Sequence, residues 1–256
     1  SGFEIIITAR DFETVAKTLG KKANTYISEA YKTEETKLVE NKVNVYDTGI
    51  FNSAQFGYDG TGIVVAVLDT GLDYTHTAFS VNNFTADESK LGLTFEDVAA
   101  VLDDSVAAEM NPGLTASDVY VNKKVPFAFD YADEDSDVYP ISSDHGTHVS
   151  GIIAGKDDTI TGVAPNAQIV SMKIFSDIQD SARTSWILAA LEDCVILGVD
   201  VINMSLGSGC GFTREVDEEH TNEIYDSIRE AGISLITAAG NDYNATMGST
   251  KNGNNG

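Results

Sequence analysis

Four polar groups in this sequence have side-chain types and positions suited to acid–base chemistry. Asp69 directly follows a continuous apolar run, His145 opens a segment of helical character, and Ser205 and Asn241 follow further apolar runs. A charged side chain at the end of a buried strand is costly unless it is hydrogen-bonded or paired. In open α/β sheets, functional sites gather at the carboxyl ends of the strands. These residues are therefore predicted to face one cleft, with an ordinary strand-to-turn aspartate as the alternative for Asp69.

The segment around His145 has the composition of a short buried helix. Residues 143–155 read Ser-Asp-His-Gly-Thr-His-Val-Ser-Gly-Ile-Ile-Ala-Gly. Glycine and β-branched residues are poor helix formers, so helix propensity does not explain this composition. Close packing against a neighbouring element does explain it, because small side chains let two backbones approach. Asp144 is the expected N-cap, with its carboxylate accepting from the first backbone N–H groups.

The order of apolar runs and helical segments predicts an α/β fold with a doubly wound, mostly parallel sheet that is incomplete in this chain. Strands are expected at residues 63–68, 125–129, 168–175, 199–204 and 233–238. Helices are expected at residues 185–197, ended by Gly198, and at residues 215–229. Residues 80–124 are predicted to form an acidic, weakly helical insertion in which Asp97, Asp103, Asp104 and Glu109 face solvent.

Residues 1–40 are predicted to form a separate small unit before a main domain at 41–256. Strand-like segments at 4–8 and 26–31 flank a helical segment at 11–19, which is half of a ferredoxin-like unit. The polar residues 33–44 are predicted to be a linker.

Composition limits the classes of partner. The chain has 256 residues and a net charge of −24, from 40 acidic and 16 basic residues. Binding to phosphate backbones requires Lys/Arg patches, so a nucleic-acid surface is excluded, while solubility and an extracellular setting are favoured. No apolar run approaches membrane-spanning length, and there is no signal-peptide pattern. Cys194 and Cys210 are expected at opposite ends of a helix–strand unit, which predicts two free thiols.

Candidate metal ligands are few. His145 and His148 are spaced three apart on one helical face, but no other ligand has matching spacing, so His148 is predicted to be a structural, hydrogen-bonded histidine. His76 is assigned to local structure. The acidic residues after the second predicted strand could supply oxygen ligands to Ca²⁺ but lack the spacing of an EF-hand loop. A solvated acidic loop is the favoured interpretation for Asp130, Asp133, Glu134, Asp135 and Asp137.

Five segments, in this order, resemble the successive signatures of the subtilisin-like serine proteases. They are residues 69–73 (Asp-Thr-Gly-Leu-Asp), 145–151 (His-Gly-Thr-His-Val-Ser-Gly), 162–165 (Gly-Val-Ala-Pro), 203–207 (Asn-Met-Ser-Leu-Gly) and 238–241 (Ala-Ala-Gly-Asn). Each is a modest signal alone, but five in order are specific. Residues 124–127 and 129–133 further resemble the Gram-positive cell-envelope proteinase and C5a-peptidase branch, and residues 1–40 are similar to the closing half of the family's inhibitory propeptide.

The resemblance implies a serine endopeptidase that acts on polypeptides, with a role for each matched residue. Asp69 would orient His145, His145 would act as general base and then general acid, and Asn241 would donate to the oxyanion. Backbone groups of the residues after the fourth predicted strand would bind an extended substrate, and small residues after the fifth would line its side-chain pocket. These substrate-binding residues are Ser205, Leu206, Gly207, Ala238, Ala239 and Gly240.

The sequence departs from the family pattern at two places. The family's nucleophile lies in a Gly-Thr-Ser-x-Ala-x-Pro segment well after the oxyanion asparagine, and Gly248-Ser249-Thr250 lacks that context. The serine is therefore expected outside these residues, on a truncated continuation or on a second chain produced by nicking. The family's commonest calcium site is also expected to be absent, because one carboxylate ligand falls on Ala78 and the loop 156–161 is short. No cofactor is required, and other calcium sites stay open.

The resemblance further implies a secreted or cell-surface protein made as a zymogen, with cleavage expected in the linker between Thr33 and Asn44. Two other functional classes fit the sequence less well. A non-catalytic binding or regulatory protein on a protease scaffold would not need Asp69, His145 and Asn241 together. A nucleotide-binding domain is disfavoured because Gly57, Gly60 and Gly62 precede their strand and no P-loop is present.

Overall fold

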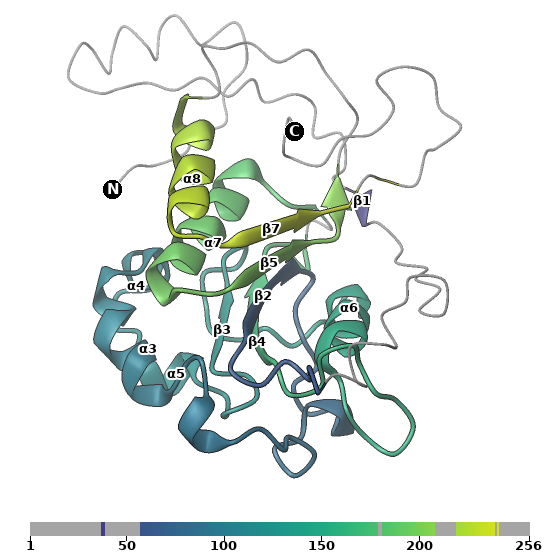
Figure 1. The fold of residues 1–256 in the computed structure, drawn as a ribbon. Helices are drawn as coiled ribbons and strands as arrows, with labels where there is room; N and C mark the ends of the chain where they lie inside the picture. The colour runs from purple at the N-terminus through teal and green to yellow at the C-terminus, as the bar shows by residue number, and fades with distance from the viewer. Residues whose placement is uncertain (1–36, 39–56, 179–180, 208–218, 239, 241–256) are drawn as a thin grey trace, which may run out of the picture.

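The computed structural model describes residues 37–38, 57–178, 181–207, 219–238 and 240 (Figure 1). They form a five-stranded sheet covered by helices on both faces, together with a separate two-stranded pairing. None of the described helices is long and apolar enough to cross a membrane. The segments predicted at 4–8, 11–19 and 26–31 and most of the linker lie outside the described residues, as does Cys210.

The five-stranded sheet has the order β3-β4-β2-β5-β7, and every neighbouring pair is parallel. Its strands are β2 (Val64–Asp69), β3 (Phe127–Asp130), β4 (Gln168–Lys173), β5 (Val201–Met204) and β7 (Ser234–Thr237). The first of these strands in the chain, β2, lies in the middle of the sheet. The chain winds to β3 and β4 on one side of it and then to β5 and β7 on the other. Such a reversal opens a crevice at the carboxyl ends of the strands, so the predicted doubly wound sheet is confirmed and Asp69 ends the strand at the reversal.

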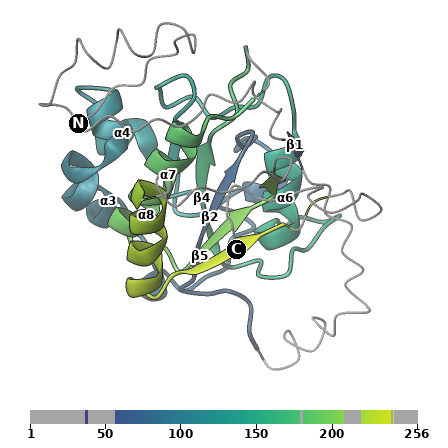
Figure 2. The same ribbon diagram turned by 90° about the horizontal axis from the view of Figure 1, so that it is seen from above.

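The helices lie in two layers, one on each face of the sheet (Figures 1 and 2). One face is covered by α6 (His145–Ala154), which packs on β2 and β4. The other is covered by α7 (Thr184–Leu197), against which α8 (Glu219–Glu230) and the insertion pack. The insertion contains α3 (Phe95–Val101), α4 (Val106–Met110) and α5 (Ala116–Val119). Single 3-10 turns occur at η2 (Thr77–Phe79), η3 (Glu88–Lys90) and η4 (Leu102–Asp104).

Alternation of side chains along β2 divides the core between these two layers. Val64, Ala66 and Leu68 belong to the apolar cluster under α7, whereas Val65 and Val67 belong to the cluster under α6. Successive side chains of a strand point to opposite faces, so a strand covered on both sides is expected to be predominantly apolar. The continuous apolar run before Asp69 predicts a strand that is buried on both faces, and all residues of β2 and β4 are buried.

The outer half of the sheet is less buried than its centre. Alternate residues of β5 are only partly buried, and Ile236 of β7 is 54% exposed. The cause is positional, because β7 is the last strand of the sheet among the described residues, and α6 lies over β2 and β4. Gly198 does end α7 as predicted, in the left-handed region with φ of 66°.

A buried carboxylate of α7 helps to attach the acidic insertion to the core. Asp193 of α7 accepts hydrogen bonds from the N–H groups of Val106 and Ala107 at the start of α4, and from the Tyr131 hydroxyl at 2.7 Å. A buried carboxylate needs such donors to offset its lost hydration. The four acidic residues expected to face solvent are exposed, namely Asp97, Asp103, Asp104 and Glu109.

Close backbone contact explains the small residues of α6. A Cβ atom added to Gly146 would lie 2.3 Å from the carbonyl oxygen of Gly71, in the turn after β2. The predicted N-cap was wrong in detail, because Asp144 occupies the cap position but its side chain makes no capping hydrogen bond. Instead, the hydroxyl of Thr70 accepts from the Gly146 N–H at 2.9 Å. The helix start is thus satisfied by the turn on which it packs.

Substitution of Gly146 tests this close contact. Gly146→Ala should lower the free energy of unfolding by about 1–3 kcal/mol, because the added methyl group overpacks the contact with Gly71. Gly151→Ala, on the same helix, is the matched control. Its added Cβ would have its nearest neighbour at 3.8 Å, so it should be neutral or stabilising by about 0.5–1 kcal/mol. Denaturant unfolding of both variants measures the difference, and equal effects would contradict the packing argument.

A buried lysine lies at the other end of the sheet, before β3. Lys124 is 1% exposed, and its ammonium donates to the carbonyl oxygens of Pro165 and Ala167 and lies over the Phe84 ring. Burial is the main cause that lowers the pKa of Lys124 to about 7, and the positive charge of Lys156 adds to it. The ammonium has no carboxylate partner among the described residues.

This lowered pKa predicts a pH dependence of stability. Between about pH 7 and pH 10, the unfolded chain binds a proton at Lys124 that the folded chain has released, so stability must rise with pH across this window. In Lys124→Met, that rise should be smaller. Thermal unfolding of wild type and variant at a series of pH values tests it, and identical slopes would refute the assignment.

Candidate active site

The carboxyl ends of the five strands place charged and polar residues in one row. Register pairs Asp130 of β3 with Lys173 of β4, and Lys173 with Asp69 of β2. Leu68 pairs with Met204, and Met204 pairs with Thr237, so Ser205 and Ala238 continue the row one residue later. The hydrogen bond from the Ala238 N–H to the Met204 carbonyl, at 3.1 Å, extends the pairing of β5 and β7. Asp69 and Ser205, two of the four residues predicted to face one cleft, therefore lie at the same edge of the sheet, whereas Asn241 lies outside the described residues.

The central feature of this edge is the contact between Asp69 and His145. The imidazole Nδ1 lies 2.8 Å from Oδ1 of Asp69, although the residues are 76 positions apart in the chain. The Asp69 side chain is 1% exposed and that of His145 is 13% exposed. A carboxylate at hydrogen-bond distance from Nδ1 favours the tautomer that carries its proton on Nδ1, and it stabilises the imidazolium. Because Nδ1 is engaged by Asp69, this geometry supports acid–base chemistry at the other ring nitrogen, Nε2.

Backbone contacts fix both members of the pair. Oδ1 of Asp69 also accepts from the Thr70 N–H at 2.8 Å, while Oδ2 is buried and has no hydrogen-bond partner among the described residues. Beyond the Thr70–Gly146 bond, the Thr147 hydroxyl accepts from the Asp73 N–H at 2.8 Å. The first turn of α6 is therefore attached to the turn after β2 on both sides of the imidazole.

The described residues among those assigned to substrate binding follow the ends of β5 and β7. Leu206 and Gly207 form β6 (Leu206–Gly207), which pairs antiparallel with β1 (Lys37–Leu38), a segment of the predicted linker. Ser205 is buried, and its hydroxyl accepts from the Asn203 side chain at 3.1 Å. Ala238 and Gly240 follow β7, and Gly240 has a φ of 95°. Ala239 and Asn241 lie outside the described residues.

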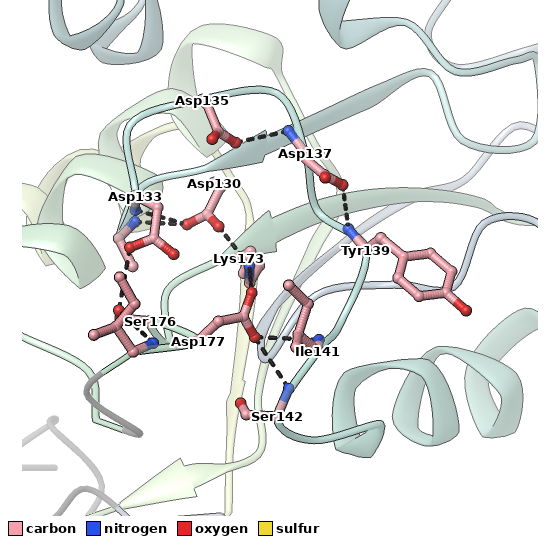
Figure 3. A network of polar contacts seen from close by, with 12 residues as sticks. Asp130, Asp133, Asp135, Asp137, Tyr139, Ile141, Ser142, Lys173, Ser176 and Asp177 are labelled. Atoms are coloured by element: carbon pink, nitrogen blue, oxygen red, sulfur yellow. Dashed lines mark hydrogen bonds and ion pairs between the residues drawn. The ribbon is translucent and has the colours of Figure 1, made fainter.

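The acidic segment after β3 corrects the prediction of a fully solvated loop. Asp133, Glu134, Asp135 and Asp137 are exposed, but Asp130 is 1% exposed and forms an ion pair with Lys173 at 2.6 Å (Figure 3). Burial raises the pKa of the Asp130 carboxyl to about 6, and the hydrogen bond with Lys173 opposes that rise. The side chain is buried because Asp130 is the last residue of a strand that is covered on both faces.

Asp130, Asp133 and Asp177 have carboxylate oxygens close enough together to bind a cation such as Ca²⁺. The Lys173 ammonium, however, already contacts both Asp130 and Asp177. The other acidic feature, the loop 156–161, closes on itself through an antiparallel bridge between Lys156 and Thr161. The Lys156 N–H donates to the carbonyl of Ala78 at 2.9 Å, at the place where the family's common calcium site was expected to be missing.

Three further side-chain assignments can be compared with the structure. His76 is local structure as predicted, since its Nδ1 accepts from the Ala78 N–H and caps η2. His148 is exposed and makes no side-chain hydrogen bond to a described residue, so its predicted hydrogen-bonded role was wrong. Cys194 is a buried free thiol in α7, as predicted.

Sequence reasoning missed Thr70, Lys173 and Asp177. Thr70 had a signal, because it stands inside the Asp-Thr-Gly segment. Lys173 also had one, because a lysine within an otherwise apolar strand of a parallel sheet requires a buried partner.

With this geometry established, comparison with known proteins is informative. Residues 60–255 match the Subtilase family of peptidases. The chain is 34% identical over 212 residues to the PI-type proteinase of Lactococcus lactis subsp. cremoris, covering 79% of this chain and 10% of the relative. It is 33% identical over 192 residues to a C5a peptidase of Streptococcus pyogenes serotype M3, covering 72% of this chain and 15% of that protein.

Among solved structures, fervidolysin from Fervidobacterium pennivorans, described as a keratinolytic enzyme related to subtilisin, matches with a TM-score of 0.47 and 25% identity, covering 74% of this chain and 23% of that one. The curated relatives are much longer than this chain, which spans 10–15% of their length. The match over residues 60–255, together with the Asp69–His145 pair at the reversal of the sheet, identifies the chain as a member of the subtilase family.

Proposed function

We propose that this chain is part of a serine endopeptidase, with Asp69 and His145 as two members of its catalytic triad. The observation that carries the proposal is the 2.8 Å contact between Asp69 Oδ1 and His145 Nδ1 at the edge where the sheet reverses. The relatives are named as proteinases and peptidases, which supports peptide-bond hydrolysis. A polypeptide is the substrate class that follows.

The proposed mechanism uses the two nitrogens of His145 differently. With the Nδ1 proton directed at Asp69, Nε2 presents a lone pair that accepts the proton of a serine hydroxyl as it attacks the peptide carbonyl. The same proton then passes from Nε2 to the leaving amine. Asp69 stays ionised throughout and stabilises the imidazolium, and the side-chain amide of Asn241 donates to the oxyanion. The reaction needs no cofactor.

The substrate would bind as an added strand along the residues that follow β5. β6 already accepts an antiparallel strand, β1, which supports an extended backbone at Leu206 and Gly207. Ser205 lies in the same edge row as Asp69, and Ala238, Ala239 and Gly240 would line the pocket for the side chain before the cleaved bond.

The nucleophilic serine would come from outside residues 1–256. No segment of the chain has the family's Gly-Thr-Ser-x-Ala-x-Pro pattern. In addition, β7 has no partner on its outer side among the described residues, and Ile236 is half exposed there. An apolar edge of this kind is normally covered by further structure. A continuation of the same polypeptide, or a second chain after nicking, would complete the sheet and bring the serine.

Labelling of the full-length protein tests the triad. A fluorophosphonate probe should label one serine beyond residue 256, and Asp69→Asn should lower the rate of peptide hydrolysis by about 10⁴-fold, because the imidazole loses its correct tautomer. His145→Ala should abolish labelling. His76→Ala, which alters only a local turn, is the control with unchanged labelling. A folded wild-type protein that never labels would instead support a non-catalytic scaffold.

We further propose that residues 1–40 act as an inhibitory propeptide and that cleavage lies between Thr33 and Asn44. The pairing of Lys37 with Gly207 and of Leu38 with Leu206 supports this, because β1 uses the backbone that we assign to substrate. A strand bound there excludes a competing peptide. Secretion or display at the cell surface, as proposed from the branch resemblance, fits processing of this kind outside the cell.

Inhibition in trans tests the propeptide. A synthetic peptide of residues 31–44 should inhibit the processed enzyme competitively, raising KM without changing kcat. The same peptide with proline in place of Lys37 and Leu38 cannot donate to the ladder and should inhibit at least tenfold more weakly, as loss of backbone hydrogen bonds of about 1 kcal/mol each implies. Equal inhibition by both peptides would refute strand pairing as its basis.

A further inference from the structure

Lys173 is a buried lysine at the active-site edge of the sheet, and the proposed chemistry does not use it. It is the last residue of β4 and lies in register between Asp130 on β3 and Asp69 on β2. Only 2% of its surface is exposed. Such a burial is rare for lysine unless its charge is paired, so the position requires an explanation.

Two carboxylates compensate the Lys173 ammonium. Nζ lies 2.6 Å from Oδ2 of Asp130 and 2.5 Å from Oδ2 of Asp177, as Figure 3 shows. Burial alone lowers the pKa of Lys173, but its hydrogen bonds to Asp130 and Asp177 raise it more, so the group stays charged. Removal of one partner from a buried ion pair is strongly unfavourable, which holds the three groups in one geometry.

The network continues through Asp177 to the segment that precedes the catalytic histidine. Oδ1 of Asp177 accepts from the backbone N–H groups of Ile141 and Ser142, each at 3.2 Å. Ser142 lies three residues before His145 in the chain. The position of this carboxylate therefore determines how the chain enters α6.

On its other side, Lys173 contacts the turn that follows Asp69. Its Cδ atom would lie 3.0 Å from a Cβ atom added to Gly71, so the lysine stem lies directly beside this turn. Gly71 is in the same turn as Thr70, which caps α6 at Gly146. The one side chain of Lys173 is thus in contact with the turn carrying the carboxylate and, through Asp177, with the segment carrying the imidazole.

We propose that Lys173 is a positioning residue, whose ammonium, held by Asp130 and Asp177, fixes the segment before α6 and so keeps the His145 imidazole aligned on Asp69. This inference rests on the proposed peptidase function for its kinetic consequence, but its structural consequence can be measured without activity. It also explains why the three carboxylates around this point are not assigned to a metal, since the ammonium occupies the position between two of them.

The test compares three variants of the full-length protein. Lys173→Met removes the ammonium and keeps a side chain of similar length. Asp177→Ala keeps the Lys173–Asp130 pair but removes the acceptor for the Ile141 and Ser142 N–H groups. This variant therefore still tests the link to α6 if Lys173→Met does not fold. Lys124→Met is the matched control, because it removes a second buried lysine of the same sheet, at the end opposite to Asp69 and His145.

Hydrogen exchange gives the readout that does not depend on activity. In Lys173→Met and Asp177→Ala, the amides of Ile141, Ser142 and the first turn of α6 should exchange at least tenfold faster than in wild type. In Lys124→Met they should exchange at the wild-type rate, whatever the change in global stability. Unchanged exchange of these amides in folded Asp177→Ala would overturn the proposal.

Peptide hydrolysis gives the second readout. If the wild type is active, the two network variants should lose about 10- to 100-fold in kcat, because small displacements of a catalytic group are that costly. KM should stay within threefold, and Lys124→Met should retain the wild-type kcat. A folded network variant with wild-type kcat would overturn the proposal. If the two network variants show faster exchange than wild type but the folded wild type does not hydrolyse peptides, the peptidase function is contradicted and the positioning role of Lys173 remains supported.

Discussion

The structure depends on placing a carboxylate at the end of a strand buried on both faces. Asp69 is almost completely buried, and burial of an ionised carboxylate costs several kcal/mol unless donors replace its lost hydration. The Thr70 N–H and the His145 imidazole supply hydrogen-bonding groups at one oxygen, while the other oxygen has none in the part of the chain that the structure describes. The requirement to satisfy this group links the central strand to α6. It also gives the imidazole a fixed direction, which is the property that acid–base chemistry requires.

That link is possible only because α6 approaches the strand end without intervening side chains. The contact of Gly146 with the Gly71 carbonyl leaves no room for a Cβ atom, and the Thr70 hydroxyl supplies the acceptor that the helix start lacks. Poor helix propensity at this position is therefore a consequence of its packing. The same small residues that weaken the helix in isolation allow the 2.8 Å contact between two residues distant in sequence.

A second group of charged side chains lies beside the Asp69–His145 pair. Lys173, Asp130 and Asp177 form a network one strand away from Asp69, and it contacts the chain on both sides of the Asp69–His145 pair. At the opposite end of the sheet, Lys124 is held by backbone carbonyls and an aromatic ring, with no carboxylate partner in the described part of the chain. The two lysines show that burial of a charge is handled differently at the two edges. At the carboxyl edge, the segments that follow β3 and β4 meet, and Asp130 and Asp177 supply carboxylate partners for Lys173.

The sequence by itself determined the class of fold, the order of the strands in the chain and the residues at their carboxyl ends. A strand covered on both faces is predominantly apolar, so the charged residue that ends the apolar run of β2, Asp69, was expected at the carboxyl edge of the sheet. His145 was found because small residues around it indicated close packing. What only the tertiary structure decided was which distant groups become partners. The acceptor for the start of α6 is Thr70 rather than Asp144, Asp130 is buried rather than solvated, and Asp177 holds the segment before His145. Local spacing cannot encode these choices, because each depends on where another segment passes after the sheet has formed.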